Sequence, residues 1–130
     1  MATGLSSAVA NNILNALDDA GSWTPPAAVW IKLHTGDPGA AGTSNAASNT
    51  TRQSAVFGSA TAGSATTTNT ITWTSVSATE SYSHISAWDS DSGGALIWTD
   101  ALEATRGLTA GDNFTISAGD IDISLGAVAS

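Results

Sequence analysis

The chain of 130 residues contains no cysteine and only three cationic side chains, Lys32, Arg52 and Arg106. Without a thiol there is no disulfide, no cysteine-type zinc site and no cysteine nucleophile. Binding to phosphate backbones needs clustered cations that displace counterions, and three separated cations form no such cluster. We therefore expect neither nucleic acid nor an anionic membrane face as a partner.

Charge of either sign is also scarce. Charged residues make up 11% of the chain, against about a quarter in an average globular protein. The surface must then consist largely of Ser, Thr, Gly, Asn and Ala, whose short side chains lose little entropy when packed against a neighbour. The net charge of −8 keeps free copies apart before assembly. This composition favours a protein that works in an assembly.

Long apolar runs are absent as well. The first 19 residues have neither a basic start nor a long apolar stretch. They therefore predict no signal peptide and no transmembrane span, and we expect synthesis in a cytoplasm.

A chain of this length predicts one domain with a single core. We expect a helix or arm over residues 1–24 and a β-sandwich over residues 25–130. The helix begins at Ser6 or Ser7 and runs to about Ala20, with Gly21 just past its end. Five apolar residues follow a helical spacing on one face: Leu5, Val9, Ile13, Leu14 and Leu17. Such a helix needs a partner surface, either its own sandwich or a neighbouring subunit.

The rest of the chain reads as short strands separated by turn signals. Period-two alternation predicts strands within residues 27–35, 52–57, 66–76, 81–89, 95–100 and 110–125. In the closing segment AGDNFTISAGDIDISL, each of two Ala-Gly-Asp turns precedes a short strand. Residues 39–51 are small and polar, and we expect a long exposed loop. The pattern predicts an all-β fold, an antiparallel β-sandwich or jelly roll, with an N-terminal helix.

The two histidines, His34 and His84, raise the question of a Ser-His-Asp triad. The chain has no Gly-x-Ser-x-Gly elbow, and both histidines fall within predicted strands beside apolar rows. We interpret both as structural residues held by hydrogen bonds.

The segment Asp89–Asp100 partly matches a calcium-binding loop. Asp89, Asp91, Gly94 and Asp100 stand at suitable positions. Gly93 supplies no side-chain oxygen, however, and the flanking segments are strands rather than helices. A β-hairpin turn explains the same residues, so we predict no metal site and leave calcium as an alternative.

Acidic residues suggest no catalytic pair. Asp112 and Asp120 stand in Gly-Asp turns, where the side chain serves its own backbone. Asp122 lies on a polar strand face, and Glu80 and Glu103 are expected in connections. We predict no catalytic residues, no cofactor and no enzymatic activity.

The five tryptophans allow two interpretations. Aromatic faces on a β-sandwich could form a carbohydrate-binding platform. The favoured interpretation is that Trp73, Trp88 and Trp98 fill the core, because tryptophan supplies most of the large core volume available. Trp23 or Trp30 then covers the helix or a subunit contact.

Five segments together form a recognisable series: LHTGDPG at 33–39, RQSAVF at 52–57, ITW at 71–73, SHISAWD at 83–89 and the closing segment 110–125. In this order they resemble a family of short virion proteins of actinobacterial and related tailed phages. Members are often labelled tail fibre proteins, and some are capsid decoration proteins. The resemblance implies a structural virion protein without catalysis, made in the host cytoplasm.

Within that resemblance we expect a capsid decoration protein bound to the major capsid protein, as a homotrimer on local threefold axes. The reason is that a fibre gains its length from repeats or a coiled coil, and this chain has neither. The alternative is a tail fibre or tail-tip component that can bind a receptor. A free carbohydrate-binding module is a third hypothesis.

Overall fold

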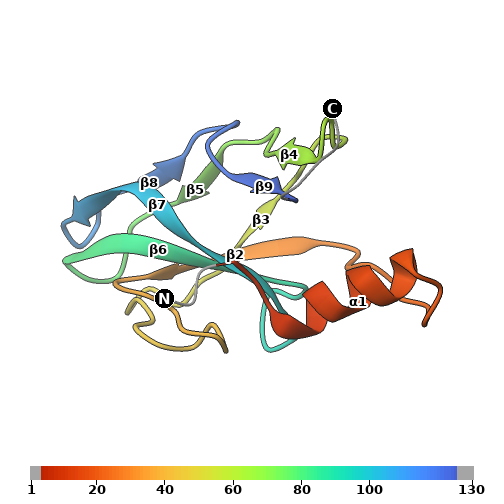
Figure 1. Cartoon of the computed structure of the whole chain (residues 1–130). Coiled ribbons are helices and arrows are strands. Elements are labelled where there is room, and N and C mark those ends of the chain that lie inside the picture. Colours follow the sequence, from red (N-terminus) through yellow and green to blue (C-terminus); the bar gives the residue numbers. More distant parts are fainter. Residues whose placement is uncertain (1–3, 126–130) are drawn as a thin grey trace.

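A five-stranded antiparallel sheet organises the chain in the computed structural model, which describes residues 4–125 (Figure 1). The strand order is β1-β7-β6-β2-β3. In chain order these strands are β1 (Gly4–Leu5), β2 (Val29–His34), β3 (Gln53–Ala55), β6 (Glu80–Trp88) and β7 (Leu96–Leu108).

Two small antiparallel sheets lie over one face of the large sheet (Figure 1). One pairs β4 (Ser64–Thr66) with β9 (Asp122–Ser124), and the other pairs β5 (Ile71–Trp73) with β8 (Phe114–Ile116). The structure confirms the predicted fold class, a mostly antiparallel β-protein with one N-terminal helix. The closing segment supplies two strands as expected, but these strands pair with β4 and β5 and not with each other.

The core lies between the two layers. The ring of Phe114 packs against Trp73 and Tyr82, with centroid distances of 5.7 and 5.2 Å. Ile71 and Ile116 are buried beside them, as the alternation of apolar residues predicts. These five residues come from three strands, and their burial excludes water from the space between the sheets.

Strand β6 departs from simple alternation. Its pairing with β7 shifts between Tyr82 and His84. Tyr82 packs on Phe114, and Ile85 lines a groove with the same ring, although unbroken alternation would place them on opposite faces. Simple alternation along residues 81–89 predicts that Tyr82 shares a face with Ser86 and Trp88. This prediction is wrong, because the irregularity changes the phase of the strand.

The segment of residues 39–51 is less exposed than expected. Ala47 is buried, and its amide donates to the carbonyl oxygen of Leu33 at 3.1 Å. The amide of Thr35 donates to the carbonyl oxygen of Asn45 at 2.8 Å. The segment thus continues the pairing of β2 beyond the end of β3, and the expectation of a wholly exposed loop is wrong.

Helix α1 (Ser7–Leu17) begins where the sequence predicts, because the Oγ of Ser6 accepts a hydrogen bond from the amide of Val9 at 3.2 Å. It ends earlier than predicted, with Asp18 as the C-cap residue. Asp19 has a φ of 62° and takes the left-handed position expected for Gly21. No helix in the described residues is long and apolar enough to cross a bilayer.

Two acidic residues lie in strands and not in connections, contrary to expectation. Glu80 is the first residue of β6, and Glu103 lies within β7. Strand β7 has 13 residues and extends well past the predicted end at Asp100. The first 24 residues also contribute β1 to the main sheet, and the division at residue 24 stays a prediction.

Candidate functional site

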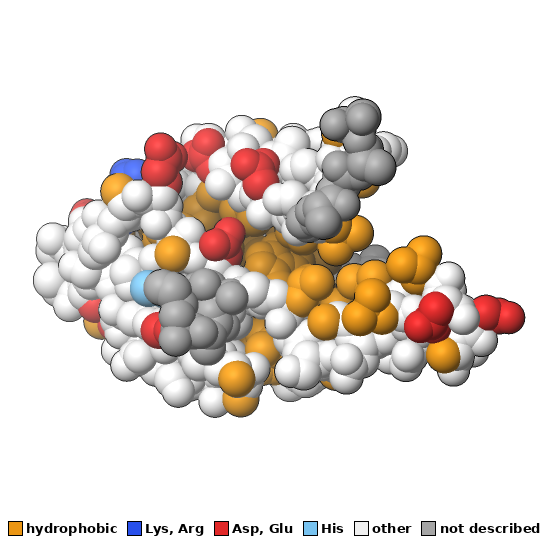
Figure 2. All heavy atoms as spheres, in the orientation of Figure 1, with side chains coloured by type: hydrophobic (Ala, Val, Ile, Leu, Met, Phe, Trp, Pro, Cys, Tyr) orange, Lys and Arg blue, Asp and Glu red, His pale blue; other side chains and the backbone are white. Residues whose placement is uncertain are grey.

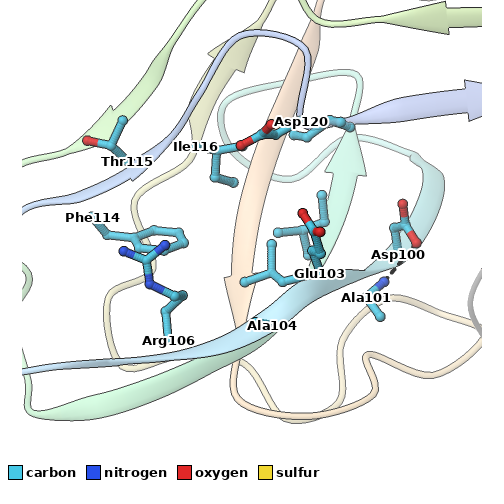
Figure 3. Close-up of a pocket in the computed structure, with 12 residues that line it drawn as sticks. Asp100, Ala101, Glu103, Ala104, Arg106, Phe114, Thr115, Ile116 and Asp120 are labelled. Carbon is cyan, nitrogen blue, oxygen red and sulfur yellow. Dashed lines mark hydrogen bonds between the residues drawn. The ribbon is translucent and has the colours of Figure 1, made fainter.

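A groove of about 350 Å³ separates β7 from the strands above it (Figure 3). Its floor is apolar and is formed by four side chains that are otherwise almost completely buried: Ile85, Phe114, Ile116 and Ile121. Ile85 comes from β6 of the large sheet. Phe114 and Ile116 come from β8, and Ile121 comes from the segment that follows it. The groove therefore exposes a small part of the hydrophobic core to solvent between β7 and the strands above it.

The rim of this groove is charged. Asp100, Glu103 and Arg106 extend from β7, while Asp120 comes from the turn between β8 and β9 (Figure 3). Glu103 and Arg106 are exposed, and so is Asp120. Three carboxylates and one guanidinium around an apolar floor suit a ligand that is elongated, partly apolar and cationic.

A second hollow, of about 200 Å³, continues the groove along β7. Asp100 lines both hollows, and the second extends to β1 and β9. Trp98 lines this end, and its buried Nε1 has no hydrogen-bond partner among residues 4–125. Together the two hollows follow β7 from Trp98 to Arg106.

Helix α1 presents an apolar surface to solvent. Leu14 is 57% exposed and Leu17 is 80% exposed, whereas Val9 is the buried residue of the helix. Figure 2 shows apolar side chains that continue from the central hollow along the helix. The apolar face predicted from the sequence is real. Leu5, Val9 and Ile13 pack on the core, whereas Leu14 and Leu17 at the C-terminal end are not covered by any part of residues 4–125.

His34 is buried within a chain of hydrogen bonds. Its Nδ1 lies 2.8 Å from the carbonyl oxygen of Ser44, and its Nε2 lies 2.7 Å from the Oγ of Ser86. Burial lowers the pKa of His34 below its usual value, and the positive charge of Lys32 acts in the same direction. No carboxylate takes part, so these contacts are those of a structural histidine and not of a catalytic triad.

His84 stands opposite His34 in the pairing of β2 with β6. Its Nδ1 lies 2.8 Å from the Oγ of Ser83, and the residue is half-buried. This contact is local and brings no acid to the imidazole.

Residues 89–95 form the hairpin turn between β6 and β7, and two polar side chains hold it. The Oδ1 of Asp89 accepts a hydrogen bond from the amide of Ala95 at 2.8 Å. The Nη1 of Arg52 donates to the carbonyl oxygens of Ser90 and Gly93, both at 2.8 Å. Its guanidinium also lies 4.5 Å from the centre of the Trp88 ring. The carbonyl oxygens of this turn thus already have a cationic partner, the guanidinium of Arg52.

Asp100 belongs to a different environment from the turn. It lies on β7, where its Oδ1 accepts a hydrogen bond from the amide of Ala101 at 2.8 Å. Within the described residues, no three His, Asp or Glu side chains are grouped to hold a metal ion. The calcium alternative for Asp89–Asp100 gains no geometric support.

The acidic residues of the closing segment serve different purposes. The Oδ2 of Asp112 accepts a hydrogen bond from the amide of Thr109 at 2.9 Å, the backbone role that the sequence predicts. Asp122 lies exposed on β9. Asp120 lines the groove, and Asp122 lines the second hollow that continues it.

The tryptophans offer no aromatic platform of the expected kind. Trp73, Trp88 and Trp98 are 1%, 8% and 4% exposed. Trp73 and Trp98 belong to the core, as predicted, whereas Trp88 is buried beneath the guanidinium of Arg52 and lies outside the core cluster. Trp23 and Trp30 are half-buried.

Sequence reasoning missed Glu103 and Arg106 as rim residues. The available signal was weak: Leu102 and Leu108 stand six residues apart, which places both on one face of a strand, and both are half-buried. The residues between them carry no apolar alternation, so the strand could not be recognised there.

The comparison with family models identifies one family. A model described as podophage GP4 fiber I protein gp80 matches residues 4–124, which is nearly the whole chain. No curated protein matches the chain.

Proposed function

Because the chain belongs to the podophage GP4 fiber I protein family, we propose that it is a tail fibre or tail-tip subunit that assembles with copies of itself as a homotrimer. Membership of the family makes it a structural component of the phage virion and not an enzyme. The family is one of fibre proteins, so it supports the fibre alternative over capsid decoration. A contact with the major capsid protein belongs to the decoration hypothesis and stays a prediction.

The uncovered face of α1 is the observation that carries the proposal of self-assembly. An isolated helix of 11 residues is marginally stable in water and depends on burial of its apolar face. Here Val9 is buried, while Leu14 and Leu17 face solvent. A neighbouring subunit would supply the missing cover.

Charge explains why another copy fits this surface. Each copy carries a net charge of −8, so most surfaces of two copies repel each other. No residue between Ser7 and Leu17 is charged. The helix face itself therefore adds no charge repulsion between identical chains, and the nearest charges are Asp18 and Asp19, which follow its C-terminal end. A cyclic trimer would gather three α1 helices around one axis, with Leu14 and Leu17 of each copy facing its neighbours.

The oligomeric state tests this interface. Sedimentation analysis of the intact chain should give a trimer, and the double variant Leu14→Ser/Leu17→Ser should give a monomer. The control Val56→Ser/Leu125→Ser also removes two exposed apolar side chains, of 54% and 52% exposure, from other parts of the surface. It should leave the trimer intact. A monomeric wild type, or an equal response of both double variants, would overturn the α1 interface.

Location in the particle tests the fibre role separately. Immunogold labelling of purified virions should place the protein at the tail, and quantitative mass spectrometry should find a small number of copies per particle. Labelling spread over the head with hundreds of copies would contradict the fibre role and restore capsid decoration.

A further inference from the structure

Within residues 4–125, strand β7 has an edge that is covered only in part. Its inner edge pairs with β6 from Leu96 to Ala101 and again from Arg106 to Leu108, with a register shift between these two parts, while β1 pairs with its outer edge at Trp98 and Thr99. From Asp100 to Leu108, the outer edge has no backbone partner within residues 4–125. An uncovered strand edge is a template for the addition of another strand.

The direction of the backbone groups can be followed along this edge. The amide of Ser6 donates to the carbonyl oxygen of Ile97 at 2.9 Å, which places the backbone groups of Ile97 on the outer edge. Alternate residues share this orientation, so Thr99 and Ala101 also face outward. At Ala101 the carboxylate of Asp100 takes the outward amide. The side chain of Asp100 therefore takes the hydrogen bond that an added strand would otherwise accept from this amide.

The groove beside this edge has a fixed chemical character. Its floor is apolar, and three acids surround it: Asp100, Glu103 and Asp120. Arg106 stands at the far end of the same strand segment. A long cationic side chain could lay its methylene groups on the floor and reach the carboxylates with its head group.

We propose that this groove binds an extended segment of a different protein, which adds as a strand to β7 and directs alternate Lys or Arg side chains inward. Backbone hydrogen bonds to the β7 edge would supply affinity, and the acids would select the charge. Arg106 disfavours a cation beside it, so the cations of the partner lie toward Asp100 and Glu103. The proposal concerns a contact between unlike proteins and does not depend on the trimer.

A second copy of this chain does not have the required chemistry. Its three cations stand at positions 32, 52 and 106, so no segment of the chain carries two cations at alternate positions. Residues 1–3 and 126–130 contain no Lys or Arg. The net charge of −8 further disfavours insertion of one copy into the acidic groove of another.

Titration of the intact, ¹⁵N-labelled protein with defined peptides tests the proposal. The probe is a capped seven-residue peptide in which threonine alternates with lysine. We expect chemical-shift changes and slower hydrogen exchange at amides between Ala101 and Leu108. A peptide with glutamate in place of lysine should not bind. A lysine peptide with alternate N-methylated backbone amides should bind at least tenfold more weakly, because it cannot complete the strand.

Charge-neutral variants separate the groove from the general acidity of the chain. Glu103→Gln/Asp120→Asn should weaken binding of the lysine peptide at least tenfold. The control Asp18→Asn/Asp19→Asn removes the same charge from the end of α1 and should leave the affinity within twofold. Equal weakening by both pairs, equal binding of the N-methylated peptide, or no binding of the lysine peptide at all would each overturn the proposal.

Discussion

The hydroxyl of Ser86 lies 2.7 Å from the Nε2 of His34, and this hydrogen bond has one possible direction. A carbonyl oxygen can only accept, so the Nδ1 of His34 donates to Ser44. Burial keeps the imidazole neutral by lowering its pKa, which leaves Nε2 as an acceptor. Ser86 must then donate to His34, and its oxygen accepts from the Nε1 of Trp88 at 2.7 Å.

This chain of hydrogen bonds ties three parts of the molecule together. It begins on β6 at Trp88, crosses to β2 at His34 and ends at Ser44 in the segment of residues 39–51. Every polar atom in it has a partner, as buried polar groups require. The arrangement fixes the segment against the large sheet.

Replacement of Ser86 by alanine should destabilise the protein strongly. The Nε2 of His34 and the Nε1 of Trp88 would both lose their partners in a buried site, at about 1–3 kcal/mol each. We expect a loss of about 2–4 kcal/mol in the free energy of unfolding, measured by urea titration. The control Ser83→Ala removes a hydroxyl that bonds to the half-buried His84 and should cost less than about 1 kcal/mol. Equal losses of unfolding free energy in Ser86→Ala and Ser83→Ala would contradict the hydrogen-bond network.

The stability of the protein should fall as the pH drops below 6.5 because of His34. Its pKa is lowered in the folded state from the usual 6.5, first by burial and then by the charges of Lys32 and His84, against the opposing effect of the Ser44 carbonyl. The unfolded chain therefore takes up the proton first. The contribution is complete above pH 6.5 and is lost as the pH falls toward the folded-state pKa.

The measurement is the free energy of unfolding at pH 7.5 and pH 5.0, compared between the wild type and His34→Asn. The variant retains the other titrating groups, so the difference between the two pH dependences reports His34. A wild type whose pH dependence equals that of the variant would contradict the buried neutral histidine.

The sequence predicted strands well where one face is buried and the other is not. Ile71 and Trp73 alternate with polar residues, and so do Phe114 and Ile116, because each strand covers the core from one side. The start of α1 was also predictable, since the cap at Ser6 is a local hydrogen bond.

The same dependence on burial explains why the second half of β7 could not be predicted. Residues from Glu103 to Gly107 are exposed, so no core selects an alternating pattern. Strand partners were also beyond reach. The Gly-Asp turns before β8 and β9 are local, whereas the choice of β5 and β4 as partners depends on contacts distant in the chain.

The candidate sites depend on distant residues to a still greater extent. Ser86 stands 52 positions from His34, and both come from strands whose order the sequence does not reveal. Glu103 and Asp120 meet across the groove only because β7 is long enough to reach it. The residue types suggested no chemistry, and the fold supplied the juxtaposition.

Glu80 should hold the segment of residues 39–51 in place. Its two carboxylate oxygens accept hydrogen bonds from the amides of Ser48 and Asn49, at 3.1 and 3.3 Å. Glu80→Gln keeps one acceptor and loses the other. We expect a loss of about 1 kcal/mol in unfolding free energy and faster hydrogen exchange in residues 39–51. Glu103→Gln serves as the control and should leave exchange in this segment unchanged.

Replacement of Asp19 by glycine should stabilise the protein. Asp19 has a φ of 62° directly after α1, and its negative charge stands at the negative end of the helix dipole. Glycine accepts this backbone conformation and removes the charge, so we expect a gain of about 0.5–1 kcal/mol. Asp18→Gly is the contrasting variant, because Asp18 has a φ of −100° and its Oδ1 accepts from the amide of Ala20. If urea titration showed a higher free energy of unfolding for both variants, it would contradict the assignment of the left-handed position to Asp19.

The two glycines of the hairpin after β6 should respond differently to alanine. Both have positive φ, 59° at Gly93 and 74° at Gly94, so each substitution carries a backbone cost of about 1 kcal/mol. A Cβ at Gly93 meets no atom within 4 Å. A Cβ at Gly94 would overlap the Oδ1 of Asp89 and lie 2.9 Å from the Cβ of Ser90.

Asp89 cannot move away without losing its hydrogen bond from the amide of Ala95. Gly94→Ala should therefore add the loss of that bond to the backbone cost and destabilise by at least about 2 kcal/mol in urea titration, against about 1 kcal/mol for Gly93→Ala. In Asp89→Ala the overlap with the carboxylate is absent and only the close contact with the Cβ of Ser90 remains, so the further substitution Gly94→Ala should cost less there than in the wild type. An unchanged cost of Gly94→Ala in the Asp89→Ala background would show that the Asp89 carboxylate does not restrict this position.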